Sequence, residues 1–352
     1  MKVTMDDIAK LSGVSKATVS LVLNQKRSSL ALSSRTVMKV LETSRKLNYR
    51  PDAVAVALSQ RKNLPLTLLV LSPWLYSQFS DFMAQVNRTL SALSSEFPLK
   101  VSYELFHPGL LQKVLTPARS SRFDAVLVLG TVPQDHQFLQ KKQQAFTNIV
   151  LLNRDVPGYC CSYGNDDEAC SAMADRIFAG GHYRRCVLGF NDKPSLNEEK
   201  RLKGFLAGLQ KYDPIVEHCA LDSELPPEQR VTGLYALHRP DLPTVFFLPQ
   251  YYPAALLLKL FSKHGVAVPE QAGIACYDCH SLLSNFLQPE LTTIDPDITT
   301  MTRHALAMAR QIKAGESAES CMVNGVFVPG GTTVLRKTAK KTLKHRESSK
   351  DE

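Results

Sequence analysis

The sequence predicts a small all-α N-terminal head joined to an α/β body of two doubly wound parallel-sheet lobes. Residues 4–24 show the pattern of two short amphipathic helices joined by a tight turn. Beyond residue 64, near-continuous apolar runs alternate with helix-like stretches, which is typical of parallel sheets covered on both faces. The 352 residues are enough for a head and about two further lobes.

The first predicted helix begins after Thr4, a suitable N-cap, and carries acidic residues in its first turn. We expect Ile8 and Leu11 to face inward. Gly13 supplies the backbone freedom that a sharp turn between helices requires. These features predict a first helix that ends at Gly13.

Ser15 can cap the second helix, whose apolar positions are Val19, Val22 and Leu23. Its outer surface is small and polar, so it can approach phosphates and base edges. That surface comprises Lys16, Ala17, Thr18, Ser20, Leu21 and Asn24. A plain helical hairpin would show a similar pattern, but a third helix capped by Ser33 would complete a three-helix unit with an apolar face of Val37, Val40, Leu41 and Leu47.

Two ordered motifs lie in this region, D-I-A-K-L-S-G-V-S-K-A-T-V-S-x-V-L-N at residues 7–24 and N-Y-R-P-D-A-V-A-x-A-L at residues 48–58. Through them the chain resembles the LacI/GalR family of bacterial transcription regulators, whose best-known type is the lactose repressor. The resemblance implies a helix-turn-helix DNA-binding domain at 1–50, a hinge helix and linker at 51–64, and a homodimer, or a tetramer made of two dimers. The body would be periplasmic-binding-protein-like.

The resemblance also implies that Leu58 wedges between base pairs in the minor groove of operator DNA, with Ala55 close to the groove floor. Read on residue types alone, residues 52–58 are equally an Ala-rich linker helix. Leu21 departs from the family, which commonly has Arg there, so a two-pronged guanine contact is lost. The expected DNA contacts are completed by Thr4, Met5, Ser15, Thr36 and Tyr49.

Charge is concentrated at the two ends of the chain. Residues 1–62 carry a net charge of +8 and residues 336–352 a net +4, which leaves −3 for the body out of the total of +9. A basic head on a mildly acidic body favours binding to double-stranded DNA. Residues 336–352 are highly charged and lack aromatic and valine-type residues, so they predict a disordered basic tail, either solvated or adding non-specific DNA attraction.

The expected compartment is the cytoplasm, with no membrane partner. No run of about 18 apolar residues suggests a membrane span, and the N-terminal residues lack the layout of a signal peptide. Eight cysteines fit buried thiols better than a disulfide framework. Cys276 and Cys279 form a lone C-x-x-C motif beside His280. We expect this motif to flank the end of a strand, and a metal-binding or redox role is the less favoured alternative.

The body is expected at residues 65–335, with a first lobe at about 65–164 and 295–335 and a second at about 165–292. The chain would cross between lobes near Asn165-Asp166, return near Leu291–Asp297, form a helix around Thr300–Ala314 and end in one strand near Val323–Val328. The candidate strands before that are Thr67–Leu71, Val101–Phe106, Ala125–Leu129, Ile149–Leu152, Cys186–Phe190, Val245–Leu248 and Gly273–Cys276.

Ligands in such folds lie outside the carboxyl ends of the strands, so a small-molecule effector is expected between the lobes. By the resemblance, Arg201 and Asp278 are effector-binding residues, with Asn153 and Gln250 as further candidates. An Arg opposite an Asp suits a ligand with hydroxyls or a carboxylate, such as a sugar or related metabolite, or forms a structural ion pair. Aromatic candidates for stacking on a ring, or for plain lobe packing, are Trp74, Tyr76 and Phe79.

Other functions fit the sequence less well. No Gly-rich phosphate loop, nucleophile elbow or credible metal cluster is present, so we expect neither an enzyme nor a cofactor. A transport-type solute-binding protein would need a signal peptide and no basic head. An architectural DNA-binding protein with a vestigial pocket remains the alternative to an effector-controlled repressor, since Pro249, Tyr251 and Cys279 depart from the family's pocket.

Overall fold

The computed structural model describes residues 4–23, 32–47, 49, 64–74, 80–278 and 286–335. The chain divides into two compact units, Met1–Leu64 and Pro65–Glu352. Among the described residues, no helix is long and apolar enough to cross a membrane. Several predictions concern residues outside these ranges, namely the hinge helix with Ala55 and Leu58, the basic tail, and Asn24, Tyr76, Phe79, Cys279 and His280.

The head is formed by α1 (Met5–Ser12), α2 (Lys16–Leu23) and α3 (Ser34–Lys46). The predicted caps are confirmed. Thr4 accepts a hydrogen bond from the Asp7 backbone N–H and forms a capping box with the Asp7 side chain. Gly13 ends α1 in the left-handed region, with φ of 65°. The Ser15 hydroxyl accepts from the Thr18 N–H, and Ser33 caps α3 in the same way.

The apolar core of the head contains Ile8, Val19, Val22 and Val40. The expectation that Leu11 faces inward was wrong, because its side chain is 64% exposed. Ser12, one helical turn after Ile8, takes the buried position instead and donates its hydroxyl hydrogen to the Ile8 carbonyl. Counted from Ile8, Leu11 is at i+3 and Ser12 at i+4. In this eight-residue helix, the i+4 position continues the buried face and the i+3 position does not.

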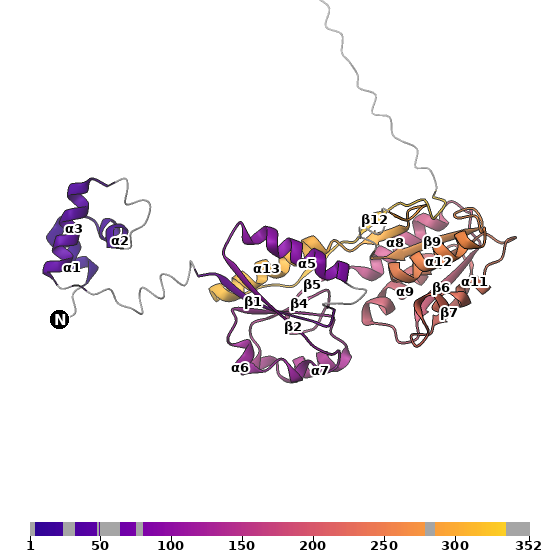
Figure 1. Ribbon diagram of the computed structural model, residues 1–352, viewed down its shortest axis with the longest axis horizontal. Coiled ribbons are helices and arrows are strands. Elements are labelled where there is room, and N and C mark those ends of the chain that lie inside the picture. Colours follow the sequence, from indigo (N-terminus) through magenta and orange to yellow (C-terminus); the bar gives the residue numbers. More distant parts are fainter. Residues whose placement is uncertain are drawn as a thin grey trace, which may run out of the picture. The chain divides into compact units, whose positions relative to one another are not determined.

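The first lobe is built on a sheet with strand order β11-β5-β4-β3-β1-β2, and all the pairs within it are parallel. In Figure 1, α5 and α13 lie on one side of this sheet and α6 and α7 on the other. The elements are β1 (Leu66–Ser72), α5 (Ser80–Ser94), β2 (Leu99–Leu105), η2 (Leu111–Lys113), α6 (Pro117–Ser120), β3 (Ala125–Leu129), α7 (Pro133–Lys141), η3 (Gln143–Ala145), β4 (Ile149–Leu152), β5 (Cys160–Gly164), α13 (Ile298–Ala314) and β11 (Cys321–Val323).

The second lobe repeats this plan with strand order β12-β10-β9-β8-β6-β7, in which only the pair of β12 with β10 is antiparallel. Apolar clusters cover both faces of its sheet. The elements are α8 (Asp166–Phe178), β6 (Arg185–Asn191), α9 (Leu196–Leu209), β7 (Ile215–Leu221), α10 (Pro227–Arg230), α11 (Thr232–Ala236), β8 (Thr244–Leu248), α12 (Tyr251–Lys263), β9 (Ala272–Tyr277), β10 (Thr292–Asp295) and β12 (Val326–Val328). The predicted doubly wound α/β body is thus confirmed.

The prediction of one final strand near Val323–Val328 was wrong. The segment forms two strands in different sheets, since β11 pairs with β5 of the first lobe and β12 with β10 of the second. Residues 326–335 therefore pack with the second lobe, contrary to their assignment to the first. Gly325 allows the switch, because a Cβ there would lie 2.6 Å from a methyl of Ile294.

Within the described residues, the chain passes between the lobes at three places, after β5, after β10 and after β11. The first passage is tied to the third by Asn165, whose side-chain oxygen accepts a hydrogen bond from the Gly325 N–H at 2.8 Å. Asp166 follows at the start of α8. The passages therefore place polar side chains at the level where the carboxyl ends of the two sheets face each other.

Candidate functional site

The exposed side of the head presents several of the predicted DNA contacts. Thr4, Ser15 and Lys16 are exposed, and Thr18 and Thr36 are half-buried beside the caps that they complete. Tyr49 packs partly against the head core. The helices α1 and α2 include Met5, Ala17, Ser20 and Leu21, but the structure does not describe these four side chains.

A cleft of about 370 Å³ lies between the two lobes of the body. It is lined by five predicted effector candidates, Trp74, Asn153, Arg201, Gln250 and Asp278. Trp74 packs edge-on against Phe82, with 5.8 Å between ring centroids, and both rings border the cleft. The structure thus brings together residues that are up to about 200 positions apart in the sequence.

Asn153 and Asp278 occupy corresponding positions in the two lobes. Each directly follows a parallel strand, β4 or β9, and each has a left-handed backbone, with φ of 58° and 72°. This region is unusual for residues other than glycine, although Asn and Asp adopt it more readily than most. The cleft therefore lies at the carboxyl ends of both sheets, as the fold class predicts.

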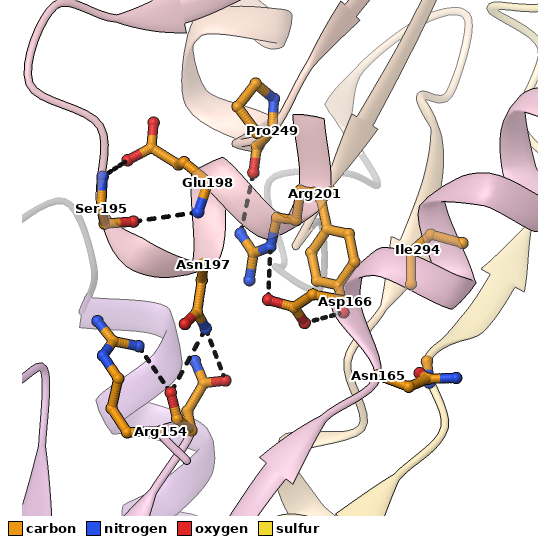
Figure 2. A network of polar contacts seen from close by, with 12 residues as sticks. Arg154, Asn165, Asp166, Ser195, Asn197, Glu198, Arg201, Pro249 and Ile294 are labelled. Carbon is orange, nitrogen blue, oxygen red and sulfur yellow. Dashed lines mark hydrogen bonds and ion pairs between the residues drawn. The ribbon is translucent and has the colours of Figure 1, made fainter. Parts of the chain in front are cut away.

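Arg201 is anchored within the second lobe, as Figure 2 shows. Its Nε donates to Asp166 Oδ2 at 3.2 Å and its Nη1 to the Pro249 carbonyl at 2.9 Å. The guanidinium lies over the ring of Tyr277 at 3.7 Å, and the Tyr277 hydroxyl donates to Asp166 Oδ1 at 2.7 Å. Burial lowers the pKa of Arg201, but the combined effect of Asp166 and other nearby acidic groups, including Asp278, outweighs burial, so the net shift is upward. Asp166, rather than Asp278, is the ion-pair partner of Arg201.

The first turn of α9 adds a fixed set of polar groups to the cleft. Ser195 caps the helix, and the Glu198 carboxylate accepts a hydrogen bond from the Ser195 N–H in a capping box. Asn191 Nδ2 donates to the other Glu198 oxygen at 2.7 Å. Asn197 Nδ2 donates to Asn153 Oδ1 at 3.0 Å, so the two lobes are joined by a direct hydrogen bond at the cleft.

Arg154 is a second buried cation on the cleft, supplied by the first lobe, and it was not among the predicted site residues. Its Nε donates to the Thr131 carbonyl at 3.0 Å and its Nη1 to the Asn153 carbonyl at 2.6 Å. Burial lowers the pKa of Arg154 to about 10, and repulsion from Arg201 adds to that effect. Its position directly after Asn153, at the end of a buried strand, is the sequence signal that could have identified it.

Other cleft residues were also missed by the sequence reasoning. They are Phe82, Pro108, Gly130, Val132, Asn191, Lys193, Pro194, Ser195, Asn197, Glu198, Ser223 and Arg230. Most of them lie in loops or in the first turn of a helix, where composition gives little indication of which way a side chain points. The sequence indicated Asp166 only as part of a crossing between the lobes, and its ion pair with Arg201 was not predicted.

Two family models match the chain. The bacterial regulatory protein lacI family matches residues 4–52, and the periplasmic binding protein-like domain matches residues 174–333. The three-helix head has a lacI-type sequence, and the two-lobed body resembles a periplasmic binding protein. Together they define the class of protein as a bacterial DNA-binding regulator. The chain belongs to the lacI family of bacterial regulatory proteins. This family consists of transcriptional regulators rather than enzymes.

Among its relatives, the chain is 25% identical over 307 residues to a Bacillus subtilis (strain 168) protein described as a probable HTH-type transcriptional repressor ExuR, which covers 83% of this chain and 86% of the relative. It is 26% identical to the HTH-type transcriptional repressor PurR of Actinobacillus pleuropneumoniae serotype 3 (strain JL03), with 83% and 85% covered. The lac repressor dimer bound to operator and the anti-inducer ONPF has a TM-score of 0.65 at 20% identity, with 95% of this chain and 100% of that chain covered.

Proposed function

We propose that the chain is a sequence-specific transcriptional repressor that binds a pseudo-palindromic operator as a homodimer and responds to a small-molecule effector. The observation that carries the proposal is the capped α1–α2 pair around Gly13 within a region of net charge +8. The outer residues Lys16 and Thr18 would approach DNA from α2, and the basic charge would supply the salt-dependent part of the affinity. The relatives that share over four-fifths of the chain are repressors by name.

Pairing through the body is supported by two edge strands. β2 and β7 each end their sheet, and they expose Tyr103, Leu105 and Ile215, whose exposed fractions are 41%, 45% and 53%. Large apolar side chains on an unpaired edge favour contact with a second copy. Two heads would then read two half-sites over about 10–20 bp, with the hinge residue Leu58 in the central minor groove. The lac repressor, whose fold is similar, is itself described as a dimer bound to operator.

The cleft supports control by an effector. Arg201 contacts Asp166, which lies at the first passage between the lobes, and the neighbouring Asn165 holds the third passage at Gly325. A ligand bound more tightly by one arrangement of the lobes would favour that arrangement, and operator affinity would change with it.

The proposal is tested by selecting bound sequences from a random duplex library with the full chain at about 150 mM salt, where non-specific phosphate attraction is weak. The expected result is a palindrome with a flexible central step. Leu58→Ala should then lose more affinity for that palindrome than for a scrambled duplex. Recovery of no consensus, with similar binding to unrelated sequences, would support the alternative of an architectural DNA-binding protein.

A further inference from the structure

The two buried arginines on the cleft differ in what neutralises them. Arg201 pairs with Asp166 at 3.2 Å and stacks on Tyr277, so its charge is satisfied within the second lobe. Arg154 is 6% exposed, and both of its hydrogen bonds go to main-chain carbonyls, those of Thr131 and Asn153. Within the part of the chain that the structure describes, it forms no ion pair with a carboxylate. Arg154 is therefore a buried charge that no carboxylate of the described residues contacts directly.

An uncompensated buried charge is costly, and proteins commonly satisfy it with a partner of opposite sign. The lowered pKa of Arg154 agrees with this geometry, because burial and the nearby Arg201 both act against the charged form, while Asp166 and Glu198 only partly offset them. Arginine remains protonated even so, since its pKa stays near 10. The guanidinium thus keeps its charge at neutral pH and has the planar donor geometry that suits a carboxylate or phosphoryl group.

The remaining charged groups on the cleft also favour an anion. Besides Arg154, the cleft is bordered by three cations and the two acids Glu198 and Asp278. Of the cations, Arg201 is neutralised by Asp166, Lys193 pairs with the exposed Glu224 at 3.4 Å, and Arg230 is the third. Glu198 is already engaged by Ser195 and Asn191. Amide groups near Arg154, from Asn153 and Asn197, and that of Gln250 offer hydrogen-bonding groups for hydroxyls.

We propose that the effector is a small hydroxylated organic anion whose carboxylate or phosphoryl group binds Arg154, while amide side chains of the cleft hold its hydroxyls. This inference rests on the proposed effector-controlled function and specifies the class of ligand. A neutral sugar would fill the same space and leave the Arg154 charge without a partner. The volume of about 370 Å³ fits a ligand of the size of one sugar unit and its anionic group.

The test measures thermal unfolding of the full chain in the presence of three probes, with sodium chloride added to equal ionic strength. Gluconate and sorbitol form a matched pair, because they share a six-carbon polyhydroxy chain and differ at the end that carries the carboxylate. Inorganic phosphate probes the phosphoryl alternative. We expect gluconate, phosphate or both at about 10–50 mM to raise the unfolding midpoint by at least about 2 °C, and sorbitol to raise it less.

Arg154→Gln should abolish the anion-specific increase. Arg122→Gln serves as the matched control, because Arg122 is an exposed arginine of the same lobe that does not border the cleft. Which probe acts distinguishes a carboxylate site from a phosphoryl site. An equal effect of sorbitol, no effect of either anion, or an anion effect that persists in Arg154→Gln would overturn the proposal.

The assay contains no DNA, so its failure leaves the DNA-binding proposal standing. Conversely, an Arg154-dependent anion effect in a protein that selects no DNA consensus would contradict the regulator function and leave the anion site in place.

Discussion

The two walls of the cleft are built on different electrostatic principles. The second-lobe wall carries Arg201 with its own carboxylate, Asp166, and a tyrosine ring against its guanidinium. The first-lobe wall carries Arg154, whose hydrogen-bond partners among the described residues are main-chain carbonyls. One wall is therefore electrostatically complete without a ligand, and the other is not. We therefore expect the stability of the fold to depend mainly on the second wall and ligand selectivity mainly on the first.

The largest expected effect comes from breaking the pair on the second wall. Asp166→Asn leaves Arg201 buried at 4% exposure without its countercharge, and we expect a loss of about 3–5 kcal/mol in the free energy of unfolding. Urea denaturation measures the change. Asp167→Asn, at the next and exposed position of α8, should cost under about 1 kcal/mol.

Adding Arg201→Gln to Asp166→Asn should recover part of the loss, because the uncompensated charge is then removed. Equal stability of Asp166→Asn and Asp167→Asn would show that the ion pair does not support the second wall.

A smaller effect is expected from the packing that positions Arg201. A Cβ added at Gly204 would lie 2.1 Å from the Asp167 carbonyl oxygen, so Gly204→Ala must push α9 away from α8. We expect a loss of about 1–3 kcal/mol, measured in the same way. Gly233→Ala is the matched control, since the nearest atom there is 3.4 Å away. If both variants unfold alike, the close helix contact is not what holds the second wall.

On the first wall, Arg154→Gln should change the free energy of unfolding of the ligand-free chain by no more than about 1 kcal/mol. The lost hydrogen bonds to Thr131 and Asn153 are offset by removal of a buried charge. Chemical denaturation without added anions provides the measurement. A loss above about 2 kcal/mol would mean that Arg154 is a structural residue, and the contrast between the two walls would disappear.

The smallest effect concerns His136, which lies behind the first wall with its Nε2 2.8 Å from the Thr131 hydroxyl. Burial lowers the pKa of His136 below its ordinary value of 6.5, and Arg154 lowers it further, although Asp135 opposes the shift. As the pH falls below about 6.5, His136 is therefore protonated in the unfolded chain before it is protonated in the folded chain. The stability contributed by neutral His136 is complete above about pH 6.5 and is lost as the pH falls through the folded pKa.

Comparing the free energies of unfolding of wild type and His136→Gln between about pH 5 and pH 7 tests this, and the wild type should lose more stability at the acidic end. Parallel profiles would show that His136 is not held in the neutral form.

The head and the outline of the body could be predicted from the sequence because their signals are local. Thr4, Gly13, Ser15 and Ser33 act on N–H groups or backbone angles within a few residues of themselves. The central strands are buried on both faces and read as apolar runs. Leu11 was predicted wrongly because α1 is short, and periodicity over eight residues does not separate i+3 from i+4.

The cleft could be predicted only in part, because its contacts join distant segments. Asp166 and Arg201 are 35 positions apart, and their contact requires α8 and α9 to pack closely at Gly204. Strands β11 and β12 have three residues each, too few for a pattern that would assign them to different sheets. Arg154 could not be distinguished from a solvated loop arginine until the structure placed it on the cleft.

Whether this chain recognises a specific DNA sequence is decided by its equilibrium affinity for matched duplexes. The full chain is titrated into the selected palindrome and into a scrambled duplex of equal length and composition, at about 150 mM salt. We predict binding to the palindrome that is at least about 10³-fold tighter. Affinities that agree within about tenfold would contradict sequence-specific regulation by this protein.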